Sequence, residues 1–545
     1  MKKIVAIIFV FLEFRSFAQV NKLSTSLQRP KLIVGIVVDQ MRWDYLYRYY
    51  DRYSNDGFRR LLHGGFSCDN AMINYIPSVT AAGHTVIYSG SVPAISGITG
   101  NEWTDQLTGR TVYCTTDTLV QGVGAMLATE GRMSPRNMLV TTITDELRLA
   151  TNFKSRVIGV SLKDRASILP AGHLGTAAFW LDDASGRFIT STYYMKQLPD
   201  WVNQFNNKNR IGSLIENEWN TLYPLNTYKQ SDPDNASYEG RFSGEQGSGF
   251  PHNIKEVYAT NKGSFRNTPF GNTLTLEFAK EAFNAYQLGK GAATDFLAIN
   301  FASTDAVGHM FGINSIEIED TYLRLDKDLA NLFQTLDATL GKEQWLVFLS
   351  ADHGAAHAIG FMQQHDLPAD YWSARGLADS LNQLLSEKFR GGPLVLSIGN
   401  YQVNFDLNKI NSLGLDYEAI KRASVEFLQR QPGISFAIDI SKLGQVAAPE
   451  PLKTMINNSY YFKRSGAIQI ILNPGWFESG RTGTGHGVWN PYDTHIPLIW
   501  YGWKIKPGRL NRRVNMSDIA PTLAALLQIQ MGNESTGQVI EEVVH

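Results

Sequence analysis

Short apolar runs rich in β-branched residues recur along most of the chain and are separated by longer amphipathic stretches. They cover residues 31–39, 155–162, 295–303, 344–350, 468–472 and 496–500. Such runs are typical of buried parallel strands, because helices cover both faces of a parallel sheet. Helical patterns fall between or after them, for example over residues 320–340 and 517–527. The pattern predicts an α/β fold around a central, mostly parallel sheet.

Two stretches depart from this pattern. Residues from about 176 to 272 are rich in Trp, Tyr, Asn, Gly and Ser and show little periodicity, and residues from about 357 to 411 are also irregular. Long segments of this kind inside an α/β chain are commonly functional insertions. We expect both to cap a site rather than to join the sheet, within one elaborated domain over residues 19–545.

The N-terminus has the composition of an export signal. Met1, Lys2 and Lys3 precede an apolar run over residues 4–12, and small residues lead to Ala18 before Gln19. This order is typical of a secretory signal peptide cleaved after Ala18. No later segment reaches about 18 uninterrupted apolar residues, the length that a membrane span requires. We therefore expect residues 1–18 to be removed from an exported protein, periplasmic or secreted, with no membrane span.

Composition narrows the class of partner. With 545 residues, 43% of them hydrophobic, the chain can bury a large core. A formal net charge of -1 and no long basic block give no electrostatic basis for binding nucleic acid, so a small molecule is the expected partner. Cys68 and Cys114 are too few for a disulfide scaffold, and both one bridge and two buried thiols remain open. The oligomeric state is left undetermined.

Carboxylates and imidazoles stand where strand-like runs end, or in a glycine-rich loop. They are Asp39, Asp305, His309, Asp352, His353 and His486. Taken alone, each has an ordinary explanation, since an Asp after a strand is commonly a helix cap or turn residue. Their joint placement is more specific, because α/β sheets bind ligands beyond the carboxyl ends of their strands. Two tetrahedral zinc ions need about eight ligand positions, which these six side chains, a nucleophile and a water or substrate oxygen would supply.

The segment 76–85 contains the candidate nucleophile. Pro77 and Ser78 come before Thr80 and a run of small residues, which suggests a helix start. A hydroxyl there lies where the helix dipole and a cation both favour an alkoxide. On its own, this segment is better explained by simple helix capping through Ser78 or Thr80.

In this order, Asp39, Thr80, Asp305-x-x-x-His309, Asp352-His353 and His486 resemble the metal and nucleophile set of the alkaline phosphatase superfamily. The similarity extends over residues 31–529 and includes Pro491-Tyr492-Asp493. The resemblance implies a three-layer sandwich in which Asp305, His309 and His486 hold one zinc. A second zinc would be held by Asp39, Asp352 and His353, with Thr80 bridging toward phosphorus, and Gly354 would permit the turn that the adjacent ligands require.

Branches of this superfamily differ in their nucleophile. Sulfatases need a Cys or Ser in a C/S-x-P-x-R setting, which neither cysteine supplies, and Thr80 argues against the Ser-type phosphoglycerate mutases. Ser-type alkaline phosphatases add a magnesium site, for which the chain offers no convincing ligand set. Nucleotide pyrophosphatase/phosphodiesterases share the Thr and two zincs, and they contact the phosphoryl group through an Asn without added cations.

Asn101 is available for the contact through an Asn, and the cations Lys163 and Arg165 separate the remaining branches. Lys163 and Arg165 follow the apolar run 157–162 directly, where they would match the extra negative oxygen of a monoester, although a solvated basic turn is the plainer interpretation. With the other motifs, the pattern resembles the phosphate-irrepressible alkaline phosphatases. It implies an exported zinc enzyme that hydrolyses phosphate monoesters through a phosphothreonine. The alternatives are a phosphodiesterase or phosphonate hydrolase of the same superfamily, and a non-catalytic metal- or phosphate-binding protein.

Overall fold

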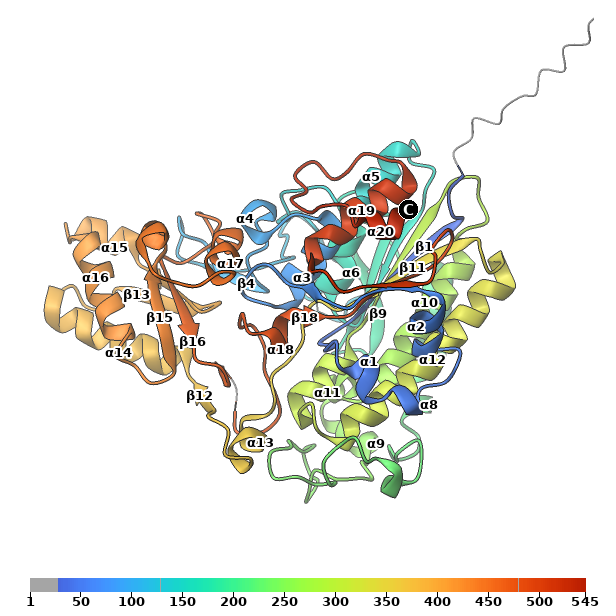
Figure 1. The fold of residues 1–545 in the computed structure, drawn as a ribbon, viewed down its shortest axis with the longest axis horizontal. Helices are drawn as coiled ribbons and strands as arrows, with labels where there is room; N and C mark the ends of the chain where they lie inside the picture. Colours follow the sequence, from blue (N-terminus) through green and yellow to red (C-terminus); the bar gives the residue numbers. More distant parts are fainter. Residues whose placement is uncertain (1–27, 128, 479) are drawn as a thin grey trace, which may run out of the picture.

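A ten-stranded sheet crosses the molecule and has the order β20-β2-β19-β11-β1-β10-β7-β8-β9-β6 (Figure 1). The computed structural model describes residues 28–545 except 128 and 479, so the predicted signal peptide lies outside the described residues. The strands are β1 (Leu32–Val38), β2 (Phe66–Cys68), β6 (Gly122–Val123), β7 (Val157–Val160), β8 (Ala177–Asp182), β9 (Arg187–Ser191), β10 (Asp295–Phe301), β11 (Trp345–Ser350), β19 (Leu498–Gly502) and β20 (Gly508–Leu510).

The centre of this sheet is parallel. β11, β1, β10, β7 and β8 pair in parallel, whereas β19 joins β11 antiparallel. Val38 is in register with Phe301, and Val37 with Ser350, so β1, β10 and β11 end at the same level. The residues that follow these strands are therefore delivered to one edge of the sheet. The predicted α/β fold with a mostly parallel sheet is confirmed.

Helices cover both faces of the sheet and give three layers (Figure 1). One face carries α2 (Phe58–Gly64), α10 (Phe270–Ala285) and α12 (Ile316–Leu340), and the other carries α3 (Thr80–Ser89), α5 (Ile143–Ala150), α6 (Asp164–Ala171), α19 (Ile519–Leu527) and α20 (Glu541–Val544). α12 begins four residues before the predicted 320–340 helix, because the Ser315 side chain caps it by accepting from the Ile318 N–H.

The beginning of the first predicted cap, residues 176–272, belongs to the large sheet instead. β8 and β9 lie within residues 176–272, yet both belong to the large sheet. β8 is rich in buried Ala and aromatic residues, which suit a strand although they break the β-branched pattern used to find one. The rest of the region forms α7 (Asp200–Asn207), α8 (Arg210–Leu214), α9 (Ile254–Thr260) and loops. The loops contact the site side of the molecule, where the Gly240 N–H donates to the Met310 carbonyl.

The second irregular stretch is the beginning of a larger unit, which we call the second lobe and which runs from β12 (Asp370–Trp372) to β17 (Trp476–Glu478). Its antiparallel sheet is formed by β13 (Val395–Gly399), β14 (Gln402–Phe405), β16 (Ile468–Leu472) and β15 (Ile434–Asp439), with α14 (Ala374–Phe389), α15 (Leu407–Ser412), α16 (Tyr417–Leu428) and α17 (Leu452–Ser459) around it. The run 468–472 was thus assigned to the wrong sheet. β16 is buried on both faces, between two hydrophobic clusters, so its sequence imitates a central parallel strand.

Several smaller elements complete the fold. β3 (Ala71–Met72), β18 (His495–Ile496) and β21 (Val514–Asn515) form a three-stranded sheet, and β4 (Glu102–Thr104) pairs with β5 (Thr111–Tyr113). The short helices are α1 (Tyr45–Arg48), α4 (Pro93–Ser96), α11 (Ser303–Phe311), α13 (Ile359–Gln364) and α18 (Pro491–Thr494). Cys68 and Cys114 are separate buried thiols in different hydrophobic clusters.

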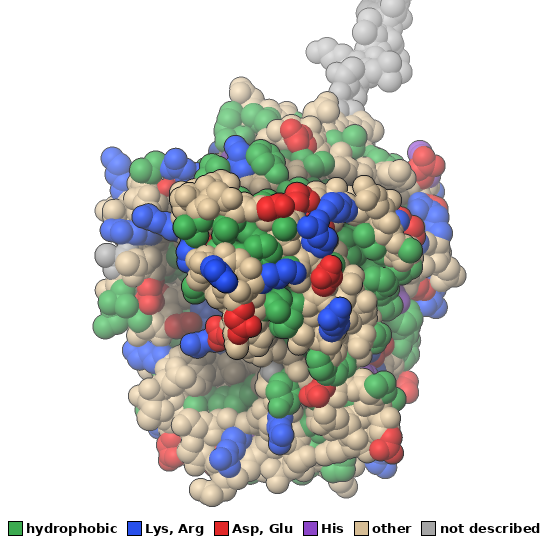
Figure 2. Space-filling model, turned by 90° about the vertical axis from the view of Figure 1, so that its left-hand side faces the viewer, with side chains coloured by type: hydrophobic (Ala, Val, Ile, Leu, Met, Phe, Trp, Pro, Cys, Tyr) green, Lys and Arg blue, Asp and Glu red, His purple; other side chains and the backbone are tan. Residues whose placement is uncertain are grey.

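The outer face of the second lobe agrees with the charge balance of the sequence. Figure 2 views the second lobe from outside and shows basic and acidic side chains interspersed over that face. Within the described part of the chain, no helix combines the length and the apolar composition needed to cross a bilayer.

Candidate active site

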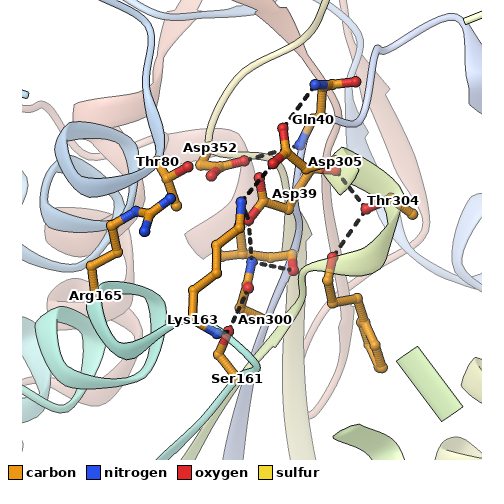
Figure 3. Close-up of polar contacts among 12 residues, drawn as sticks. Asp39, Gln40, Thr80, Ser161, Lys163, Arg165, Asn300, Thr304, Asp305 and Asp352 are labelled. Atoms are coloured by element: carbon orange, nitrogen blue, oxygen red, sulfur yellow. Dashed lines mark hydrogen bonds and ion pairs between the residues drawn. The ribbon is translucent and has the colours of Figure 1, made fainter. Parts of the chain in front are cut away.

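The level ends of β1, β10 and β11 bring three carboxylates together (Figure 3). Asp39 follows β1, and its carbonyl accepts from Thr304 Oγ1 at 2.5 Å. α11 begins just after β10, so Asp305 lies in its first turn and His309 one turn later. Asp352 and His353 follow β11 directly and are fully buried. The predicted residues of these three segments therefore share one site.

Three of these side chains have buried atoms that need a partner. Asp39 Oδ1, Asp352 Oδ2 and His353 Nε2 make no hydrogen bond to any described residue, and the ligand atoms of the three residues lie within 4.8 Å of one another. A buried polar atom without a partner is costly, and acceptors that converge on one point are satisfied by a cation. The chemistry of the donors therefore fits a metal ion.

A second group lies beside the first and consists of Asp305, His353 and His486, again within 4.8 Å. His353 and His486 are stacked with ring centroids 3.6 Å apart. The family resemblance implied His309 as the third member of this group, whereas the geometry includes His353. His309 lies next to the group, because its Nε2 is 3.1 Å from Asp305 Oδ1. The two groups share His353, which makes the two candidate ion positions adjacent.

The imidazoles are oriented by the backbone. The Nδ1–H groups of His309, His353 and His486 donate to the carbonyls of Thr484, Gly354 and Ser78 at 2.9, 3.0 and 2.8 Å. Each ring is thereby held as the tautomer whose Nε2 carries a lone pair, which is the form that binds a metal. Gly354 is required by close approach rather than by a turn with positive φ, because a Cβ there would overlap the Tyr492 carbonyl.

Thr80 is the first residue of α3 and is 1% exposed. α3 can approach the metal ligands because residue 83 is glycine, where a Cβ would lie only 2.6 Å from the Asp352 Cβ. Ser78, the other candidate hydroxyl, donates to the Val488 carbonyl at 2.9 Å and so holds the loop that carries His486. Of the two hydroxyls, Thr80 is the one that lies beside Asp352 and Arg165 in Figure 3.

The three predicted phosphate-binding residues differ in their contacts. Asn101 Oδ1 accepts from the Ala81 N–H at 2.9 Å, which fixes its amide beside the start of α3. Arg165 Nη1 donates to the Tyr113 hydroxyl at 3.1 Å. Lys163 Nζ instead donates to Asp39 Oδ2 at 2.8 Å and to Asp305 Oδ2 at 2.7 Å. Lys163 therefore bridges carboxylates from both groups, a contact that the sequence did not predict.

The buried charged groups of the site shift one another's pKa values. Burial would lower the pKa of Lys163, but Asp305 and Asp39 outweigh it and raise that pKa. Burial would raise the pKa of Asp305, but His309 and Lys163 outweigh it and lower that pKa. Burial and the neighbouring Asp39 raise the pKa of Asp352. The carboxylates thus repel one another and attract cations, as expected of a site that concentrates positive charge.

Sequence reasoning did not select three residues that support this site. Gln40 contacts Asp305 and Asp352, and His84 Nδ1–H donates to the Thr80 carbonyl at 2.9 Å. Asp493 Oδ2 accepts from the N–H groups of Gly487 and Val488, next to His486. In the sequence, Gln40 is marked only by its adjacency to Asp39, His84 by its four-residue spacing from Thr80, and Asp493 by the Pro-Tyr-Asp motif. None of these signals specifies a role alone.

Known proteins resemble this chain over nearly its whole length. The alkaline phosphatase PafA of Elizabethkingia meningoseptica is 50% identical over 523 residues, which cover 96% of this chain and 96% of that protein. The alkaline phosphatase PhoV of Synechococcus elongatus is 50% identical over 516 residues, or 95% of this chain and 93% of that protein.

Solved structures agree with these relatives. The crystal structure of wild-type PafA superposes with a TM-score of 0.94 at 50% identity and covers 95% of this chain and all of that one. A PafA variant in which a Thr is replaced by Ser, and an Asn, a Lys and an Arg by Ala, has a TM-score of 0.93. The family model described as type I phosphodiesterase / nucleotide pyrophosphatase matches residues 33–495. The resemblance inferred from the motifs is confirmed, and the chain belongs to the type I phosphodiesterase / nucleotide pyrophosphatase family.

Proposed function

We propose that this protein is an exported, zinc-dependent alkaline phosphatase that hydrolyses phosphate monoesters through a phosphothreonine intermediate. The observation that carries the proposal is the convergence of buried ligand atoms of Asp39, Asp352 and His353 beside Thr80, atoms that have no hydrogen-bond partner in the described part of the chain. Relatives named as alkaline phosphatases, 50% identical over nearly the whole chain, support the same activity.

Two zinc ions are the proposed cofactor. Asp305, His309 and His486 would hold one, and Asp39, Asp352 and His353 the other, with Thr80 as a further ligand of the second. Zinc prefers imidazole and carboxylate ligands in about fourfold coordination, which this donor set supplies. When bound, the zinc ions supply Lewis-acid charge that lowers the pKa of a coordinated hydroxyl or water and neutralises the departing oxygen.

Thr80 performs the first displacement. The Thr80 hydroxyl gives up its proton, and Oγ1 forms a bond to phosphorus while the bond from phosphorus to the leaving oxygen breaks; the leaving oxygen takes up a proton from solvent. A water oxygen then attacks phosphorus with loss of a proton, the Oγ1–P bond breaks, Oγ1 is protonated again and phosphate is released. Because the two displacements are in line and each inverts phosphorus, the overall reaction retains configuration.

Asn101, Lys163 and Arg165 hold the equatorial phosphoryl oxygens. Fixed donors aimed at the charge of the transition state stabilise it without reorganisation. Arg165 is well placed for this, since its guanidinium lies beside Thr80 (Figure 3). The substituted residue types of the PafA variant, and the separations between them, match Thr80, Asn101, Lys163 and Arg165 of this chain, which supports the assignment.

A phosphodiesterase is the second candidate, favoured by the description of the matching family model. The cations separate the two activities, because a monoester dianion carries one more negative non-bridging oxygen than a diester. We therefore expect kcat/KM to be higher for an aryl phosphate monoester than for the matched diester. A protein that prefers the diester would overturn the phosphatase assignment in favour of this second candidate.

A further inference from the structure

Gln40 has an unusual backbone for a residue with a side chain. It follows Asp39 at the end of β1 with φ 63°, in the left-handed region, and is 2% exposed. Such a conformation is unfavourable for a residue with a Cβ and persists where surrounding contacts over-determine it. The contacts of Gln40 therefore need an explanation.

Those contacts join the two candidate metal groups. The Gln40 backbone N–H donates to Asp352 Oδ1 at 3.2 Å, and its Nε2 donates to Asp305 Oδ1 at 2.7 Å (Figure 3). Asp352 belongs to one group and Asp305 to the other. One residue thus fixes a carboxylate of each group, through its main chain in one case and its side chain in the other.

The carboxamide is held in this orientation by α11. Gly308 lies against it, and a Cβ at this glycine would overlap Gln40 Oε1. With Oε1 turned to Gly308, Nε2 faces Asp305. The accepting atom, Asp305 Oδ1, is also the oxygen that lies 3.1 Å from His309 Nε2. Gln40 therefore sets how the Asp305 carboxylate is turned toward the histidines.

We propose that Gln40 is a positioning residue that orients Asp305 and Asp352 and thereby couples the two metal sites, an inference that rests on the proposed function. Partners that hydrogen-bond to metal-binding side chains commonly contribute about 10- to 100-fold to metal affinity. The side-chain bond to Asp305 should contribute to the site of Asp305, His309 and His486. The left-handed backbone, which aims the N–H, should serve Asp352.

The test is zinc affinity, measured by competition with a chromophoric chelator on metal-stripped protein. Gln40→Met keeps the length and the backbone donor but removes Nε2, and we expect it to weaken at least one zinc by about 10- to 100-fold. Gln40→Glu places a second carboxylate against Asp305 and should weaken zinc binding at the site of Asp305, His309 and His486 further unless the introduced carboxylate becomes protonated. The zinc affinities of both variants are therefore measured across pH. Activity at saturating zinc should recover in Gln40→Met, which a damaged fold would not allow.

Gln402→Met is the matched control. Gln402 is also buried, at 4% exposed, and donates through Nε2 to Gln469 at 2.9 Å, but within the second lobe. Its removal should leave zinc affinity unchanged. If Gln40→Met does not fold, Gly308→Ala displaces the same carboxamide and should weaken zinc by a similar factor.

Folded Gln40→Met, or Gly308→Ala in its place, that binds both ions as tightly as wild type would overturn this proposal and leave the proposed function standing. A wild-type protein that binds no zinc would overturn both.

Discussion

Arg165→Ala should lower the rate on phosphate monoesters selectively. Arg165 lies beside Thr80, its Nη1 donates to the Tyr113 hydroxyl at 3.1 Å, and its buried Nε has no partner among the described residues. Most of its donors therefore remain for substrate. A monoester presents two or more charged oxygens to this guanidinium, whereas a diester presents an esterified oxygen in place of one of them.

The size of the effect follows from the burial of the site. Removal of a charge-assisted contact to a developing oxyanion costs on the order of 2–4 kcal/mol. At about 1.4 kcal/mol per tenfold, kcat/KM for the monoester should fall by about 30- to 1000-fold. The decrease in kcat/KM for the diester should be at least tenfold smaller, so the ratio of kcat/KM for the monoester to that for the diester falls.

Lys163→Ala should behave differently from Arg165→Ala. Lys163 bridges Asp39 and Asp305, which are 0% and 6% exposed. Its loss therefore removes a positive charge that stabilises two buried carboxylates. We therefore expect losses on both substrates in addition to the monoester-selective part. Steady-state kcat/KM on a matched aryl monoester and diester, at saturating zinc, measures both variants.

Arg266→Ala controls for loss of a cation near the site. Arg266 lines the same cavity of about 450 Å³ as Arg165, but it is paired with Asp183 at 2.6 Å. Because a partly exposed pair contributes at most about 1 kcal/mol, its effect should stay within about fivefold on either substrate. Equal decreases in kcat/KM for the monoester and the diester in Arg165→Ala would refute the charge argument and indicate that Arg165 has a structural role.

Four further outcomes are expected. Thr80→Ala should lose nearly all turnover while it still binds zinc and phosphate, and Thr80→Ser should keep much of the rate because the oxygen survives; normal turnover of Thr80→Ala would exclude it as nucleophile. Elemental analysis of dialysed protein should give about two zinc ions per chain, and activity that survives full chelation would contradict this. The mature protein recovered outside the cytoplasm should begin at Gln19, as N-terminal sequencing would show, and an intact N-terminus would argue against export. Burial would lower the pKa of His252, but its hydrogen bonds to Glu245 and Glu317 outweigh it and raise the pKa to about 9. Since this exceeds the ordinary value of about 6.5, the stabilisation from His252 is complete below about pH 6.5 and is lost as pH rises through 9. Urea unfolding of His252→Gln at several pH values should lack that part of the pH dependence, and an unchanged profile would reject it.

Much of the candidate site could be recognised in the sequence because its members follow strands. A buried strand leaves a continuous apolar run, and the residue after it must lie at the carboxyl edge of the sheet. Asp39, Asp305 and Asp352 were found in this way, and the register of β1, β10 and β11 brings them level. Thr80 was found from its place at a predicted helix start and His309 from its four-residue spacing from Asp305, in both cases together with the family resemblance.

The sequence was less informative where local patterns are ambiguous. Residues 468–472 have the composition of a central strand, yet they lie in the second lobe, because burial between two clusters produces the same apolar run. β8 was missed because its aromatic residues suited an irregular segment as well as a strand. Local composition records how deeply a segment is buried and does not record which partner buries it.

The amino-acid sequence by itself determined the strand ends, the set of candidate metal-binding side chains and the hydroxyl at the start of a helix, since each depends on residues close together in the chain. Only the tertiary structure decided that His353 belongs to both candidate groups, that Lys163 bridges Asp39 and Asp305, and that Gln40 joins Asp305 to Asp352. These contacts join residues far apart in sequence, and their geometry depends on differences of about an ångström in how strands and helices pack. No local pattern of residues carries that information.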